Sequence, residues 1–179
     1  MRTDPASTLL AVIDIQERLA AVVPDCDRLI QRTVRLAKAA EILGVRRALT
    51  EQYPKGLGPT VPDLVACMPA AEEKIAFSAA GCGCLAVAPA AGCESVVLAG
   101  LETHICILQT ALELLERGVR VFVAVDAVGS RYAIDHETAL RRLELAGVVP
   151  VTTESLLFEW CRGADHARFR EVRNLVIAG

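Results

Sequence analysis

The chain has 179 residues, of which 53% are hydrophobic, 4% aromatic and 23% charged, and such a chain is too apolar to be disordered. Since chains split into separate domains only beyond roughly 250 residues, we expect one globular domain spanning residues 1–179. The net charge of -3 and the scattered Lys and Arg residues argue against nucleic acid or a membrane surface as a partner.

Short apolar runs predict the strands of a parallel sheet. Three of these runs are rich in Val, Ile and Leu at every position, as in strands that helices cover on both faces. They span residues 8–13, 95–101 and 119–125. Weaker strands are expected at residues 45–50, 74–77 and 148–151.

Segments of helical periodicity lie between these strands, and each ends at a glycine suited to a helix C-cap. The first has apolar residues on one side and Arg and Lys on the other. The expected helices are residues 27–43 before Gly44, residues 105–115 before Gly118, and residues 134–146 before Gly147.

The segment after Thr152 predicts one or two further helices. It contains Leu156, Leu157, Phe158 and Trp160, which are unusually apolar for a terminal segment. These side chains are expected to cover either the core of the chain or a partner subunit. The second alternative favours a homo-oligomer, either a dimer or a tetramer.

Strands that alternate with helices form βαβ units with right-handed crossovers. We therefore predict a single-domain, doubly wound (Rossmann-like) α/β fold with a mostly parallel sheet of about six strands in the order 3-2-1-4-5-6. In that order the strands at residues 8–13 and 95–101 are neighbours. A ligand crevice is expected at their carboxyl ends. The Pro- and Gly-rich loop at residues 52–68 is of a kind that is usually functional or mobile.

The seven cysteines lack the even framework of a small secreted protein. The apolar run near the N-terminus is interrupted by Asp14 and is too short for a signal peptide or a membrane span. Free thiols and a cytoplasmic location are therefore expected, and one thiol is a candidate for reactivity. The cysteines stand at positions 26, 67, 82, 84, 93, 106 and 161.

Cys106 is the strongest candidate nucleophile. It falls in the first turn of the helix that follows the strand at residues 95–101, if Thr103 lies near the N-cap. A helix N-terminus offers free amide donors and a positive dipole end, which lower the pKa of a thiol and can hold an oxyanion. The alternative is that Cys106 is a small, inert, buried side chain.

Two charged residues are expected beside Cys106. Asp14 ends the neighbouring strand, and its carboxylate is a candidate base, metal ligand or nucleophile; the alternative is a cap of the next segment. Lys74 lies at the edge of another apolar run, where its ammonium group favours a thiolate, although a lysine there is most often a solvated charge. Together the three residues form a candidate hydrolytic triad.

At these residues the chain resembles the isochorismatase-like cysteine hydrolase superfamily, and most closely the branch of isochorismatase domain-containing hydrolases. The resemblance extends over essentially the whole chain. Each matching stretch is short, but their order and spacing together are specific. The stretches are residues 10–16, 50–54, 74–78, 100–106, 125–131 and 153–155.

The resemblance implies a role for each member of the triad. Asp14 is the general base, Lys74 stabilises the thiolate and Cys106 is the nucleophile. It also implies a cis peptide bond after Leu101, which turns the backbone amides of Glu102 and Cys106 into an oxyanion hole. A cis bond without proline costs about 3 kcal/mol and is kept only where the surrounding fold holds it.

The chain departs from the nicotinamidases of this superfamily, which hold a metal with one Asp and two His. No His stands in the corresponding stretch at residues 50–54, where Glu51 is the one acidic residue. We therefore expect no catalytic metal and, since neither a G-x-G-x-x-G nor a P-loop motif occurs, no cofactor. Further residues are expected to line the substrate pocket: Gln16, Tyr53, Phe77 and Arg131, the last with its neighbour Ser130.

Other candidate residues have weaker support. The Cys82-Gly83-Cys84 stretch lacks the further ligands of a metal site and is interpreted as a glycine-rich loop. His104 is two residues from Cys106 and so points elsewhere on a helix, and His136 is expected at the surface. Asp126 either lines the pocket or orients a backbone turn.

The sequence thus predicts a metal-independent cysteine hydrolase that cleaves a small amide, carbamoyl or related substrate through a thioester. The alternative is a non-catalytic binding or structural protein on the same scaffold, in which Cys106 is inert or sensitive only to oxidation. The family also favours a homo-oligomer. The identity of the substrate does not follow from these residues.

Overall fold

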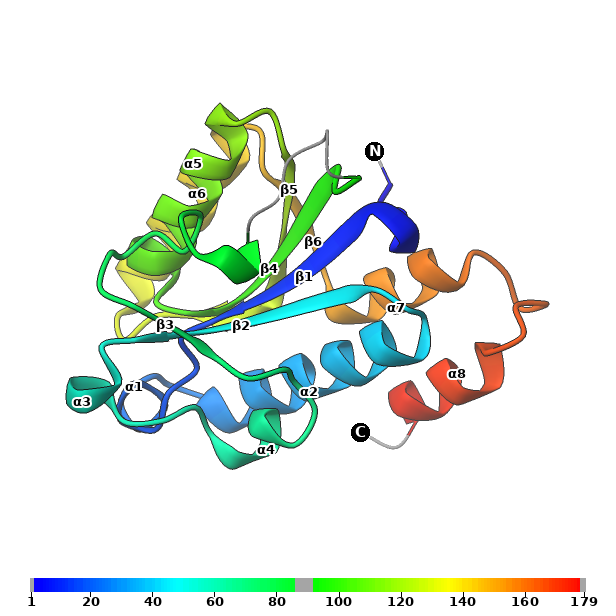
Figure 1. The fold of residues 1–179 in the computed structure, drawn as a ribbon, viewed down its shortest axis with the longest axis horizontal. Helices are drawn as coiled ribbons and strands as arrows, with labels where there is room; N and C mark the ends of the chain where they lie inside the picture. The colour runs from blue at the N-terminus through cyan, green and yellow to red at the C-terminus, as the bar shows by residue number, and fades with distance from the viewer. Residues whose placement is uncertain (1, 86–91, 178–179) are drawn as a thin grey trace.

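The computed structural model describes residues 2–85 and 92–177 as one α/β domain (Figure 1). Six strands form one sheet in the order β3-β2-β1-β4-β5-β6, and every neighbouring pair is parallel. This order and the fold class confirm the sequence prediction. The strands are β1 (Thr8–Ile13), β2 (Arg46–Gln52), β3 (Glu72–Lys74), β4 (Ser95–Leu101), β5 (Arg120–Gly129) and β6 (Val149–Val151).

Helices cover both faces of the sheet. One face packs against α2 (Cys26–Ile42) and α7 (Thr153–Cys161), and α8 (Phe169–Ile177) packs on these two helices. The other face packs against α5 (Leu108–Glu116) and α6 (Ala133–Leu145) (Figure 1). Because both faces are covered, every residue of β1 and β4 is buried, as their uninterrupted apolar sequences predict. Shorter helices lie in the connections: α1 (Glu17–Ala20), α3 (Pro54–Leu57), α4 (Pro62–Val65), and the 3₁₀ turns Pro5–Ser7 and Gly83–Leu85.

The glycines expected at the helix ends are confirmed. Gly44, Gly118 and Gly147 have φ angles of 72°, 77° and 100°, which a side chain would disfavour. Gly100 in β4 serves another purpose, since a Cβ atom there would lie 2.0 Å from the carbonyl oxygen of Ile13. Its lack of a side chain permits the close approach of β1 and β4.

Some boundaries differ from the prediction. The third strand ends at Lys74 rather than beginning there, because the carbonyls of Ala76 and Phe77 turn back to accept hydrogen bonds from the Lys74 ammonium. The strand predicted at residues 119–125 runs as β5 to Gly129, with a shift in its pairing to β4 after Leu98. This shift is a local irregularity of the ladder that hydrophobic patterning does not reveal.

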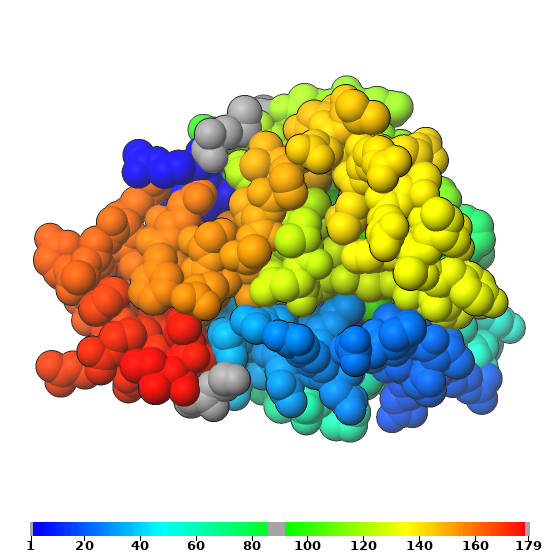
Figure 2. Space-filling model, turned by 180° about the vertical axis from the view of Figure 1, so that it is seen from behind, coloured from blue at the N-terminus to red at the C-terminus, as the bar shows by residue number. Residues whose placement is uncertain are grey.

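The apolar tail packs on the core of its own chain. Leu156, Leu157 and Trp160 of α7 are buried in the cluster that includes α2, and Phe158 packs its ring against Phe169 of α8. Figure 2 shows α7 and α8 lying beside α2 on this side of the molecule. Of the two alternatives for the tail, the structure shows the first, so the tail no longer argues for a partner subunit.

Within residues 2–85 and 92–177, no helix combines the length and the apolar character that crossing a membrane requires.

Candidate active site

Asp14 lies directly after β1, at the carboxyl edge of the sheet. Its side chain is fully buried and its backbone has a φ of 54°, unusual for a residue other than glycine. The hydroxyl of Thr50 donates a hydrogen bond of 2.8 Å to Oδ1 of Asp14. The Nζ atom of Lys74 lies 2.7 Å from Oδ2. The carboxylate is thus held from both sides by residues of neighbouring strands.

Lys74 is a buried ammonium group with several oxygen neighbours. Besides Asp14, its Nζ donates to Oε1 of Gln52 at 2.7 Å and to the carbonyl of Phe77 at 3.0 Å. A buried cation is costly unless charges and hydrogen bonds compensate it, and this shell provides both. The arrangement makes Lys74 a fixed positive charge rather than a solvated surface lysine.

Cys106 lies in the π-helical turn Thr103–Ile107, which begins one residue earlier than expected because Glu102 is its N-cap. Its Sγ atom is 3.7 Å from Nζ of Lys74. The structure therefore brings together the three residues that the sequence suggested, Asp14, Lys74 and Cys106, which come from the ends of three strands.

Burial raises the pKa of Cys106 to about 12; the charge of Asp14 also raises this pKa, whereas the charge of Lys74 lowers it. The expectation that the helix N-terminus gives a thiol of lowered pKa is therefore wrong. Desolvation by the surrounding side chains outweighs the charge of the Lys74 ammonium group. In the resting protein Cys106 is a protonated thiol at neutral pH.

The expected cis bond after Leu101 is also wrong, since the described chain, including the Leu101–Glu102 bond, has only trans peptide bonds. Glu102 has ordinary extended angles, φ -69° and ψ 120°, and its carbonyl accepts hydrogen bonds from the amides of Ile105 and Ile107. A trans bond avoids the cost of about 3 kcal/mol for a cis bond without proline. Glu102 is the N-cap of the π turn, and Cys106 lies within the turn.

The buried side chain of Glu102 joins the π turn to the segment after β5. Its Oε1 accepts from Nε of Arg131 at 3.1 Å, and its Oε2 lies 3.3 Å from Nδ1 of His104. The same His104 nitrogen lies 3.1 Å from the hydroxyl of Ser130. His104 therefore points away from Cys106, as expected, and Arg131 is held beside the π turn by Glu102.

The other expected pocket residues have different surroundings. Gln16 is fully buried and bonds the backbone of Gln52 through both ends of its amide, at 3.1 and 2.8 Å. Tyr53 and Phe77 are half-exposed, and Tyr53 lines a surface cavity of about 320 Å³ together with Lys74 and Ile75. Gln16 thus holds the end of β2 in place, while Tyr53 lies where a ligand can reach it.

Sequence reasoning missed Thr50 and Gln52 as partners of the triad. They alternate along β2, so their side chains point to the same side of the strand, toward Asp14 and Lys74. The signal available for finding them was a pair of polar residues two positions apart at the carboxyl end of β2, at the same edge of the sheet as Asp14.

Glu51 does not stand in a metal site. Its Oε1 accepts hydrogen bonds from the amide and the hydroxyl of Thr60, at 2.6 and 2.7 Å. In the part of the chain that the structure describes, no group of three or more His, Cys, Asp or Glu side chains is placed to hold a metal ion.

The remaining candidate residues of the sequence are engaged in hydrogen bonds within the fold. The amides of Gly83 and Cys84 donate to Glu72, and burial raises the pKa of Cys84 to about 12, consistent with an inert loop. Asp126 accepts two hydrogen bonds from Thr153 at the start of α7. His136 is half-buried rather than at the open surface, with Nδ1 3.0 Å from the Thr103 hydroxyl.

The structure is an open parallel sheet in which polar residues gather where the central strands end. This arrangement defines a doubly wound α/β protein, a class that binds its ligands at that edge. The model of the Isochorismatase domain matches residues 8–155. The chain belongs to this family and has the fold of the isochorismatase-like hydrolases.

Individual relatives agree with this assignment. Isochorismatase domain-containing protein 2 of Bos taurus is 41% identical over 98% of this chain and 85% of its own. A structure described as the MAR1 ribonuclease of Caenorhabditis elegans is 37% identical, with a TM-score of 0.91 over 99% of this chain and 93% of its own. The YcaC gene product of Escherichia coli, described as an octameric hydrolase of unknown specificity, is 26% identical, with a TM-score of 0.83 over 99% and 95%.

Proposed function

We propose that this protein is a metal-independent cysteine hydrolase that cleaves a small amide, carbamoyl or related substrate through a covalent thioester. The observation that carries the proposal is the buried cluster of Asp14, Lys74 and Cys106, in which one ammonium group lies 2.7 Å from a carboxylate oxygen and 3.7 Å from a thiol sulfur. A nucleophile, a base and a cation within contact of each other are the parts that acyl transfer requires.

In the first step Asp14 takes the proton of Cys106. Because the resting thiol has a raised pKa, the proton transfer accompanies attack on the carbonyl carbon rather than preceding it. Lys74 compensates the negative charge that then lies on sulfur. Its other contacts keep it in place while this charge moves.

The attack forms an S–C bond and a tetrahedral oxyanion. We propose that the backbone amides of Glu102 and Cys106 receive this oxyanion, in the trans conformation described above. A single donor of this kind typically lowers a barrier by about 3 kcal/mol. Asp14 returns its proton to the leaving nitrogen as the C–N bond breaks, which leaves a thioester on Cys106.

Water then completes the reaction. Asp14 removes a proton from the water molecule, whose oxygen attacks the thioester, and the thiol leaves with that proton. The net change is hydrolysis of one C–N bond without an oxidant, a reductant or a metal. Tyr53, Phe77 and Arg131 at the rim are proposed to contact the substrate, and Gln16 to keep the adjoining loop in position.

Turnover of a panel of small amides and carbamoyl compounds tests the proposal. We expect activity in the native chain and a loss of at least about 1,000-fold in Cys106→Ala, Asp14→Asn and Lys74→Met, as for other residues that act as a unit. Cys93→Ala is the matched control, since Cys93 is equally buried and lies outside the cluster. Full activity in Cys106→Ala would refute the mechanism.

The competing function is a binding or structural protein on the same scaffold, which would show no Cys106-dependent turnover. The ribonuclease name belongs to the neighbour from Caenorhabditis elegans, and the net charge of -3 in this chain does not favour nucleic acid.

The octameric neighbour supports a homo-oligomer here. Sedimentation tests that proposal, and a monomer would contradict it. A cytoplasmic location is proposed on the free cysteines of the described chain.

A further inference from the structure

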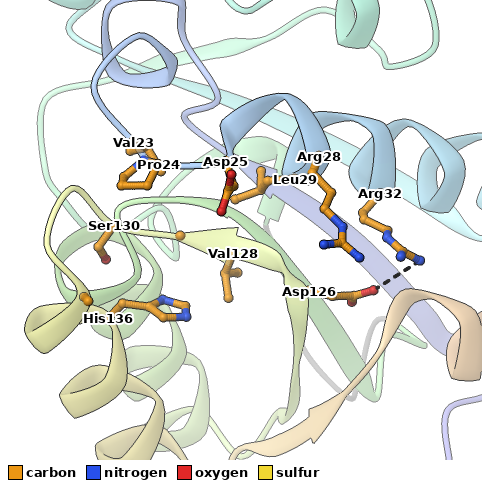
Figure 3. A pocket seen from close by; sticks show the side chains of 12 residues that line it. Val23, Pro24, Asp25, Arg28, Leu29, Arg32, Asp126, Val128, Ser130 and His136 are labelled. Atoms are coloured by element: carbon orange, nitrogen blue, oxygen red, sulfur yellow. Dashed lines mark ion pairs between the residues drawn. The ribbon is translucent and has the colours of Figure 1, made fainter.

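A cavity of about 380 Å³ is lined by residues other than Asp14, Lys74 and Cys106 (Figure 3). It is bounded by the start of α2, the end of β5 and the first turn of α6. Small-molecule sites in proteins commonly have volumes of about 300–1,000 Å³ and lie at the carboxyl ends of parallel strands. Size and place therefore both suit a small ligand.

Most of the cavity wall is apolar. Val23 and Leu29 contribute from the α2 side, and Val128 from the β5 side (Figure 3). Ala133 contributes from the start of α6. Such a wall favours a hydrocarbon or aromatic body over a fully polar molecule such as free phosphate.

The polar end of the cavity holds two arginines, and one of them, Arg28, has no charged partner within the described residues. Arg28 and Arg32 stand one turn apart on α2, and Figure 3 shows both guanidinium groups reaching toward Asp126. Asp126 forms an ion pair of 3.9 Å with Arg32 and already accepts two hydrogen bonds from Thr153. Arg28 has no ion pair or side-chain hydrogen bond to any residue in the ranges 2–85 and 92–177. Asp126 thus pairs with Arg32 and with Thr153, and the guanidinium group of Arg28 is left without a carboxylate partner in the described part of the chain.

The lining also holds a second carboxylate and one imidazole. Asp25 also lines the cavity, but it lies at the start of α2 and forms no ion pair with Arg28 within 4.0 Å. Burial lowers the pKa of His136, so its imidazole is neutral at pH 7, with Nδ1 engaged by Thr103. His136 can therefore offer a hydrogen bond from its other ring nitrogen without adding charge.

We propose that this cavity is a second ligand site, which binds a small monocarboxylate with an apolar body. The carboxylate lies against Arg28 and Arg32, and the apolar body lies over Leu29 and Val128. A carboxylate suits the site because the planar guanidinium fork binds its two oxygens together. The proposal does not depend on the hydrolytic function, since none of the triad residues takes part.

Calorimetric titration of Cys106→Ala protein with benzoate tests the proposal, because this background removes the nucleophile from the measurement. We expect one benzoate per chain. Benzamide and benzylamine have the same ring with a neutral or a positive polar group, and we expect each to bind at least about tenfold more weakly, as a lost charge-assisted hydrogen bond predicts.

Variants locate the benzoate. Arg28→Gln should weaken binding about tenfold for the same reason. Ala133→Leu should fill the cavity and abolish binding. Arg35→Gln is the matched control, since Arg35 is on the same helix and does not line the cavity, and it should bind benzoate normally. Thermal unfolding checks that each variant is folded. No benzoate binding, or binding that Arg28→Gln and Ala133→Leu leave unchanged, would overturn the proposal.

Discussion

The hydroxyl of Thr50 donates a hydrogen bond of 2.8 Å to Oδ1 of Asp14, and this contact leaves Oδ2 of the same carboxylate for Lys74. The orientation of the proposed base therefore depends on a neighbouring strand. It is a positioning contact, since Thr50 itself does not touch Lys74 or Cys106 in the described contacts.

Replacing Thr50 by Val removes this hydrogen bond and keeps the shape of the side chain. We expect kcat to fall about tenfold or more, because a hydrogen bond to a charged group contributes about 1.5–3 kcal/mol and Asp14 would lose its fixed orientation. KM should change little, and Thr50→Ser should recover much of the rate. Equal losses in Thr50→Ser and Thr50→Val would show that packing rather than the hydroxyl matters.

The two charges beside Cys106 shift its pKa in opposite directions, which gives a prediction for each. Asp14→Asn removes the charge that raises the pKa, so the pH midpoint for alkylation of Cys106 by iodoacetamide should fall, even though turnover is lost. Lys74→Met should move this midpoint upward. Mass spectrometry of the Cys106 peptide measures alkylation separately from the other thiols. A midpoint that rises in Asp14→Asn would contradict the assigned charges.

The raised pKa of Cys106 also predicts how stability changes at alkaline pH. The folded state keeps the thiol proton up to a pKa of about 12, whereas the ordinary value is 9.0, so between these pH values the unfolded state releases a proton that the folded state retains. The stability contributed by this difference is complete below pH 9 and is lost as the pH rises toward 12. The free energy of unfolding should therefore decline less steeply over this range in Cys106→Ala than in the native chain. Parallel declines would argue against the shift.

Gly100 is expected to tolerate no side chain. A Cβ atom would meet the Ile13 carbonyl at 2.0 Å, and the φ angle of 138° is unfavourable for other residues. Gly100→Ala should therefore cost about 3 kcal/mol or more through overpacking and backbone strain. Gly118→Ala is the matched control, because it also has a positive φ but open space around it, and should cost about 1 kcal/mol. Urea unfolding of both variants measures the difference, and equal costs would show that the contact with Ile13 relaxes.

The fold and the placement of Asp14 and Cys106 at one edge of the sheet were predictable from the sequence because both depend on local patterns. The strands β1 and β4 are continuous apolar runs with polar residues where they end, so Asp14 and the turn before Cys106 could be placed at one edge of the sheet.

The features that were missed or mistaken depend on side-chain contacts and burial in the folded chain. The end of β3 at Lys74 follows from carbonyl groups folding back onto its ammonium, and the raised pKa of Cys106 follows from burial by side chains on several elements. Neither effect has a signature in the local sequence. The trans bond after Leu101 corrects an expectation that came from family resemblance alone.

Trp160 is the one tryptophan in the chain, and it is fully buried where α7 packs on the core. Its fluorescence is therefore a built-in reporter of the packing of α7 against α2, and it can be excited without a signal from another indole. Since the tail contributes buried side chains to the same core as the sheet, a red shift of this emission should coincide with global unfolding as followed by circular dichroism.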